Sequence, residues 1–125
     1  MIGYVTLGTN DLARGAKFYD ELLSVMGAKR TMDMGTFIAW GNDPANPMFA
    51  LTEPFDKNPA TVGNGVMVAF KASDTDQVKA IYDKALELGA TDEGAPGPRG
   101  EGFYAGYFRD LDGNKLNAFC VGVSE

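Results

Sequence analysis

Apolar and polar residues along the first half of the chain follow two different periods. Residues 2–8 alternate with a period of two, which is typical of a half-buried strand. After Asn10 or Asp11, either of which is a good N-cap, apolar residues recur at helical spacing as far as residue 26. Residues 30–34, 36–41 and 48–53 are predicted to form three short strands. The first half is therefore predicted to be β-α-β-β-β.

The same pattern starts again in the second half. Residues 65–70 predict a strand, and a helix is predicted from an N-cap at Ser73 or Asp74 to Gly89. The halves align at a constant offset of 63 residues over these elements, which places Tyr4 on Met67. Such a period indicates a duplicated unit, so we expect a single domain, 1–125, with an internal repeat of module 1–57 and module 64–125. Because a unit of this size buries little surface alone, we expect the halves to share a sheet or a cleft.

The second half ends with a glycine- and proline-rich stretch and a predicted hairpin. Residues 94–102, GAPGPRGEG, predict a loop, which either covers a ligand or is a surface connection; general loop statistics favour the connection. Residues 103–120, FYAGYFRDLDGNKLNAFC, combine an aromatic strand, an Asp-Gly-Asn turn and a short apolar strand. This hairpin resembles the closing hairpin of the vicinal oxygen chelate superfamily, which includes glyoxalases, bleomycin resistance proteins, methylmalonyl-CoA epimerases and extradiol dioxygenases.

The resemblance implies an α+β fold of two βαβββ modules in one chain. Each module is expected to be a curled mixed sheet with a helix on its convex face and a ligand pocket on its concave face. Members with two modules per chain commonly pair, so we also expect a homodimer. In metal-using members, the third residue after the asparagine of the turn is a glutamate that binds a divalent cation, and that position here is Asn117.

The other metal positions implied by the resemblance are also unusual. They map onto Tyr4 and Met67 in the first strands and onto Phe49 as the first-half counterpart of Asn117. Phenol, thioether and a single amide are weak donors for a divalent first-row metal, and phenylalanine has no donor. We therefore expect no metal or other cofactor at the usual site. A non-standard site built from carboxylates such as Asp33, Glu53 or Glu101 remains an alternative.

Strand alternation predicts what lines the concave face instead. Pairing Arg109 with Lys115 across the turn places Tyr107 opposite Asn117, whereas Cys120 faces the helices. We expect Arg99 at the pocket mouth, where it could bind an anionic group. The predicted lining is Tyr4, Thr6, Phe37, Phe49, Met67, Tyr107, Asn117 and Phe119, which suits a small, partly aromatic molecule. A second interpretation is that these aromatic residues close a collapsed pocket as core.

Composition narrows the function classes. The chain has 125 residues, a formal net charge of −6, one cysteine and no histidine. The missing histidine excludes triads with a histidine base, histidine-carboxylate metal sites and Cys-His dyads. The chain has 17 acidic residues against 11 lysines and arginines, with no cluster of basic residues. This composition argues against nucleic acid and anionic membranes as partners. With no signal segment and no apolar run of about 20 residues, we expect a cytoplasmic protein.

Two hypotheses of function follow from the sequence. The first is a small-molecule binding protein that lacks the usual metal ligands, like the bleomycin resistance branch of the superfamily. The second is a divalent-metal-dependent glyoxalase-type lyase or dioxygenase that uses a non-standard site. A degenerate relative that serves as an interaction surface is a third possibility. Whether the protein is an enzyme stays open at this point.

Overall fold

The structure, a computed structural model, describes residues 1–122. The chain divides into two compact units, Met1–Val62 and Gly63–Glu125. Each predicted module falls within one unit, and the last three residues of module 64–125 lie outside the described residues.

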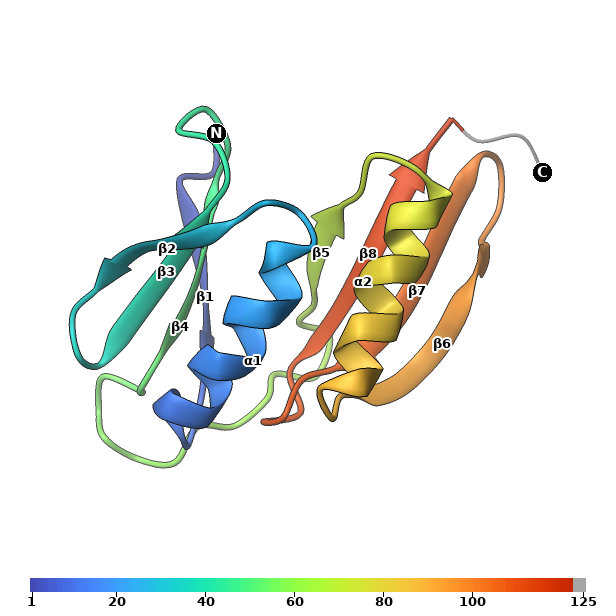
Figure 1. The fold of residues 1–125 in the computed structure, drawn as a ribbon. Helices are drawn as coiled ribbons and strands as arrows, with labels where there is room; N and C mark the ends of the chain where they lie inside the picture. The colour runs from blue at the N-terminus through green and yellow to red at the C-terminus, as the bar shows by residue number, and fades with distance from the viewer. Residues whose placement is uncertain (123–125) are drawn as a thin grey trace. The chain divides into compact units, whose positions relative to one another are not determined.

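The first unit is a four-stranded mixed sheet with one helix packed on one of its faces, the face predicted to be convex (Figure 1). Its elements are β1 (Tyr4–Gly8), α1 (Leu12–Ser24), β2 (Lys29–Asp33), β3 (Phe37–Gly41) and β4 (Met48–Thr52). The strand order is β1-β4-β3-β2, with β1 parallel to β4 and the other pairs antiparallel. The predicted β-α-β-β-β order is confirmed.

Helix α1 begins after Asp11, whose side chain accepts a hydrogen bond from a first-turn amide that has no partner within the helix. The N-cap is Asp11, whose carboxylate accepts a hydrogen bond from the Arg14 amide at 3.1 Å. The buried stripe of the helix includes Tyr19, which lies against Trp40 and Phe49 of the sheet. This aromatic cluster forms the core between α1 and its sheet.

The second unit repeats this arrangement with its own sheet. Its elements are β5 (Val68–Lys71), α2 (Thr75–Glu87), β6 (Thr91–Pro98), β7 (Phe103–Arg109) and β8 (Lys115–Val121). The order is β5-β8-β7-β6, with β5 parallel to β8. Every strand pairing within residues 1–122 joins two strands of the same unit, and neither sheet closes on itself. The fold is thus the predicted pair of βαβββ modules, although the two halves do not share a sheet in this part of the chain.

Strand β6 corrects the loop prediction for residues 94–98, whereas residues 99–102 form a loop as predicted. The chain stays extended as far as Pro98 and pairs with β7, with register shifts between Asp92 and Gly94 and between Gly94 and Gly97. Glycine and proline are tolerated here because β6 is the edge strand of its sheet and is interrupted by these irregularities.

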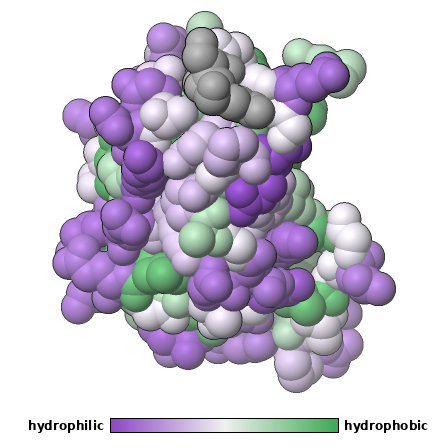
Figure 2. Space-filling model, turned by 90° about the vertical axis from the view of Figure 1, so that its right-hand side faces the viewer, coloured by the Kyte–Doolittle hydropathy of each residue, from purple (hydrophilic) through white to green (hydrophobic). Residues whose placement is uncertain are grey.

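Seen from the right-hand side of Figure 1, the surface is mainly hydrophilic, with hydrophobic residues in separated patches (Figure 2).

The turn between β7 and β8 is organised by one buried carboxylate. Asp110, which is 5% exposed, accepts hydrogen bonds from the Asp112 amide at 2.9 Å, the Asn114 amide at 2.9 Å and the Asn114 side-chain amide at 3.0 Å. Gly113 completes the turn at a φ of 89°, in the left-handed region. The resulting register pairs Arg109 with Lys115 and places Tyr107 opposite Asn117, as predicted.

Candidate functional site

The two faces of the second sheet differ in what covers them. Phe108, Leu116 and Ala118 are fully buried, and Cys120 is 3% exposed, on the face that α2 covers. Burial, together with the negative charge of Asp74, raises the pKa of the Cys120 thiol. The alternate residues of β7 and β8 point to the opposite face of the sheet, which we call the concave face after the predicted curvature. This face carries the predicted site residues of the unit.

Asn117 is the unusual residue of this concave face. Only 2% of it is exposed, and its Oδ1 atom has no hydrogen-bond partner among residues 1–122. Buried side-chain oxygens are nearly always paired, because an unpaired one loses its bonds to water without replacement. Its neighbours across the sheet are Ala69 of β5 and Tyr107 of β7. The amide therefore offers an unused acceptor on the concave face.

Two cations lie over the ring of Tyr107. The Arg99 guanidinium carbon and the Lys115 Nζ atom are each 5.6 Å from the ring centroid. Neither cation has a carboxylate within ion-pair distance among the described residues, whereas Arg109 pairs with Glu93 of β6. We call Tyr107, Arg99, Lys115 and Asn117 the Tyr107 cluster.

An aromatic pair continues the same face. The rings of Phe103 and Phe119 are stacked, with centroids 5.5 Å apart and an angle of 22° between their planes. Both residues are partly exposed, and Phe119 lies two positions beyond Asn117 on the same side of β8. The concave face therefore joins flat apolar surface to the polar and cationic Tyr107 cluster.

The concave face of the first unit is less polar. Tyr4 and Phe37 contact each other edge to face, with ring centroids 6.1 Å apart. Thr6 lies two positions after Tyr4 on the same side of β1 and is exposed. Tyr4 itself is 58% exposed, and in the second unit Met67, 40% exposed, lies one residue before β5. As ligand contacts these residues remain predictions.

The placement of Phe49 on the concave face is wrong. The centroids of the Phe49 ring and the Tyr19 ring of α1 are 4.6 Å apart, so Phe49 belongs to the core on the helix-covered, convex side. The parallel registers give the reason: Asn117 pairs with Ala69, whose counterpart Thr6 pairs with Ala50. The first-half counterpart of Asn117 is therefore Ala50, one residue further along β4, and a shift of one residue reverses the face.

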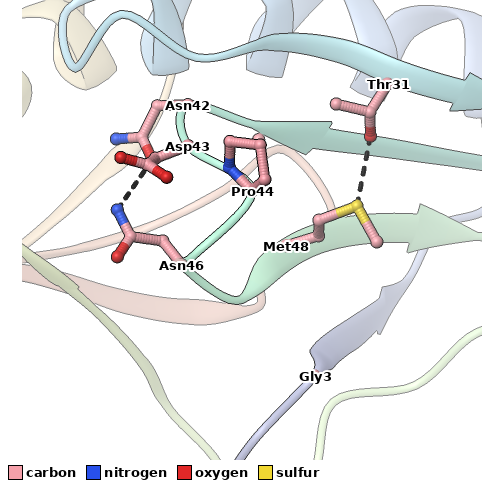
Figure 3. A pocket seen from close by; sticks show the side chains of 8 residues that line it. Gly3, Thr31, Asn42, Asp43, Pro44, Asn46 and Met48 are labelled. Carbon is pink, nitrogen blue, oxygen red and sulfur yellow. Dashed lines mark hydrogen bonds between the residues drawn. The ribbon is translucent and has the colours of Figure 1, made fainter.

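A pocket of about 460 Å³ lies at one end of the first unit (Figure 3). None of the predicted site residues lines it; its lining is Gly3, Thr31, Gly41, Asn42, Asp43, Pro44, Asn46 and Met48. The Asn46 side-chain amide donates to Asn42 Oδ1 at 3.2 Å, and the Thr31 hydroxyl donates to the Met48 sulfur at 3.2 Å (Figure 3). These polar groups are already paired with one another. The sequence signal for the pocket is the Asn- and Pro-rich segment at residues 42–47, between the predicted strands 36–41 and 48–53.

The donor set at the usual metal positions does not fit a divalent first-row cation. These positions hold Tyr4, Met67, Asn117 and, with the corrected register, Ala50. The set contains one amide oxygen, one phenol and one thioether, with no carboxylate or imidazole. Within residues 1–122, no three His, Cys, Asp or Glu side chains gather where they could hold an ion.

This architecture defines a protein with paired βαβββ modules and a concave face on each. A sequence model of the Glyoxalase/Bleomycin resistance protein/Dioxygenase superfamily matches residues 1–118. The chain belongs to this superfamily. A search of curated proteins gave no match.

Solved structures agree with this membership. A glyoxalase/bleomycin resistance protein from Albidiferax ferrireducens T118 is 35% identical with a TM-score of 0.90, and the match covers 98% of this chain and 99% of that one. A lactoylglutathione lyase from Agrobacterium tumefaciens is 22% identical with a TM-score of 0.70, covering 96% and 92% of the two chains. The second likeness is informative about the fold alone. No helix in the described part of the chain is both long and apolar enough to span a membrane.

Proposed function

We propose that this protein binds a small, partly aromatic molecule on the concave face of its second unit, without the usual metal ligands of its superfamily. Stacking on Phe103 and Phe119 supplies the apolar part of the binding energy, and Tyr107 beside them carries the two cations. The amide of Asn117 orients the ligand through a hydrogen bond. No bond of the ligand needs to be made or broken for this function.

The buried Oδ1 atom of Asn117 carries the proposal. It lies where metal-using members of the superfamily have a glutamate, and it has no partner among the described residues. A fold tolerates such an unpaired acceptor when the position is kept for a ligand, because the ligand then supplies the missing donor. An amide donates and accepts hydrogen bonds but is a poor sole ligand for a cation.

The proposal is tested by adding a set of small ring compounds, neutral and charged, and following the amide signals of the protein by NMR. Binding is expected to shift the signals of β7 and β8 around Tyr107, Asn117 and Phe119. Asn117→Leu should abolish or weaken binding of compounds that carry a hydrogen-bond donor. If no compound in the set shifts these signals, the proposed function is wrong.

The competing hypothesis is a divalent-metal-dependent lyase or dioxygenase with a non-standard site. It is tested on protein purified without an affinity tag, by measuring metal content and thermal melts with Mn, Fe, Ni and Zn salts. A melting temperature raised by one of these ions, at a concentration well below millimolar, would favour the enzyme hypothesis. No metal and no shift would favour the binding protein.

We also propose that the protein is a cytoplasmic homodimer, as is expected for two-module members of the superfamily. Light scattering should give twice the mass of 13.4 kDa, and a monomer would contradict this proposal. Fractionation of the cells that make the protein would test the compartment.

A further inference from the structure

The Arg99 guanidinium makes two hydrogen bonds to the backbone beside the concave face of the second unit. Its Nη2 donates to the Ala95 carbonyl at 2.6 Å and its Nη1 to the Pro98 carbonyl at 3.2 Å. Two glycines of β6, Gly94 and Gly97, lie next to the guanidinium. A Cβ atom at Gly94 would lie 3.3 Å from Nη2, and one at Gly97 would lie 3.1 Å from Nη1. The glycines of the edge strand thus make room for this cation against the backbone of β6.

The Arg99 guanidinium keeps unused donors. Two of its five N–H groups bond to carbonyls of the described residues, which leaves three for another acceptor. The Lys115 ammonium lies over the same Tyr107 ring and has no acidic partner within residues 1–122. Because both cations lie over one ring, their charges add at the same place on this face. Positioned cations of this kind bind anionic groups with charge-assisted hydrogen bonds.

The neighbouring groups define the rest of the ligand. Flat aromatic surface at Phe103 and Phe119 suits a ring. The buried Oδ1 atom of Asn117 accepts a hydrogen bond, so the ligand must present an O–H or N–H group there. Across the sheet, Asn117 is the direct partner of Tyr107, which places this acceptor beside the cations.

We infer that the ligand of this face is a small aromatic carboxylate that carries a hydroxyl or amino group. Arg99 and Lys115 bind its carboxylate, the ring lies on the aromatic side chains, and Asn117 accepts from the hydroxyl or amino group. This inference rests on the proposed function and adds the chemical class of the ligand to it.

The test uses the full chain and four probes: 4-hydroxybenzoate, benzoate, 4-hydroxybenzamide and phenol. Titrations are followed by NMR on the β7 and β8 amides. We expect 4-hydroxybenzoate to bind at least about tenfold more tightly than 4-hydroxybenzamide, because the amide probe lacks the charge-assisted contacts. Benzoate should bind more weakly than 4-hydroxybenzoate, because it leaves Asn117 Oδ1 unpaired.

Variants assign these preferences to side chains. Arg99→Gln should weaken 4-hydroxybenzoate binding by about tenfold or more, and Lys115→Gln should weaken it by a smaller factor. Lys79→Gln on the exposed surface of α2 removes the same charge from the same unit and should change the affinity by less than about twofold. Asn117→Leu should remove the preference for 4-hydroxybenzoate over benzoate, while keeping the preference for a carboxylate.

The outcomes separate this inference from the proposed function. If the neutral probes bind as tightly as the anions, or if Arg99→Gln changes nothing, the inference is overturned while small-molecule binding stands. If none of the four probes and none of the wider set of ring compounds binds, the proposed function fails and the inference fails with it.

Discussion

The replacement Asn117→Leu should stabilise the ligand-free protein. Asn117 is 2% exposed, and its Oδ1 atom is unpaired among the described residues. Folding therefore removes this oxygen from water without giving it a new hydrogen bond, which destabilises the folded state. Leucine has a similar size and shape and no polar atom. An unpaired buried polar group costs about 1–3 kcal/mol, and the free energy of unfolding should rise by about that amount. For a chain of 125 residues this corresponds to a rise in Tm of roughly 4 °C per kcal/mol.

Asn114→Leu is the matched control, because it replaces a second buried asparagine of the same hairpin. Asn114 is 6% exposed, and its side-chain amide donates to Asp110 at 3.0 Å. Its replacement removes that bond and leaves a buried carboxylate oxygen with one partner fewer. We expect a loss of about 1–3 kcal/mol, opposite in sign to the change at Asn117.

The assay must report on the second unit. The single tryptophan, Trp40, lies in the first unit, so its fluorescence is unsuited to this comparison. Urea unfolding followed by NMR signals of β8 amides measures the relevant free energy. If Asn117→Leu destabilises the protein as much as Asn114→Leu does, Oδ1 has a partner in solution, and the interpretation of Asn117 as an unused acceptor is wrong.

Three further predictions concern hydrogen bonds that hold the fold. Asp110→Ala removes the acceptor of three turn hydrogen bonds and should lower the free energy of unfolding by about 2–4 kcal/mol in urea; an unchanged midpoint would contradict the role of this carboxylate. The Tyr82 hydroxyl donates to Asp92 at 2.6 Å, and this bond, with burial, raises the pKa of Tyr82 to about 12. Stability from this phenol is complete below pH 10 and is lost as the pH rises towards 12; Tyr82→Phe should flatten that alkaline slope. The pKa of the Asp20 carboxyl lies below its ordinary value of 3.8, mainly because Arg30 donates a hydrogen bond to the carboxylate. The ionised Asp20 therefore stabilises the fold above pH 3.8, and this contribution is lost as the pH falls below that value. Asp20→Asn should reduce the acid-induced loss of stability, and an identical pH profile would argue against this pair.

The elements of the fold could be predicted from the sequence because each follows from a local pattern. Asp11 and Asp74 are the observed N-caps of the two helices, as the polar residue before each apolar stripe indicated. The hairpin register followed from the length of the turn alone, since pairing Arg109 with Lys115 fixes every later pair. The repeat predicted two similar modules, and the structure contains them.

Two errors came from the limits of local patterns. The offset of 63 residues applies to the first strands and the helices but not to the last strands, so it could not locate the counterpart of Asn117, which is Ala50 and not Phe49. Loop lengths differ between the halves, so only strand pairing could correct the register. Glycine and proline at residues 94–98 indicated a loop, but an edge strand with bulges tolerates both residues.

The order of strands and helices follows from the sequence alone, and so does the lack of carboxylate or imidazole at Tyr4, Met67 and Asn117, the positions that the resemblance assigns to the metal. Both depend on which residues are present and how they are spaced. The state of individual groups became visible only in the folded chain: Asn117 Oδ1 has no partner among residues 1–122, and the Arg99 guanidinium lies beside two glycines and over Tyr107. Burial and pairing depend on atoms that are distant in the sequence, so no local pattern reveals them.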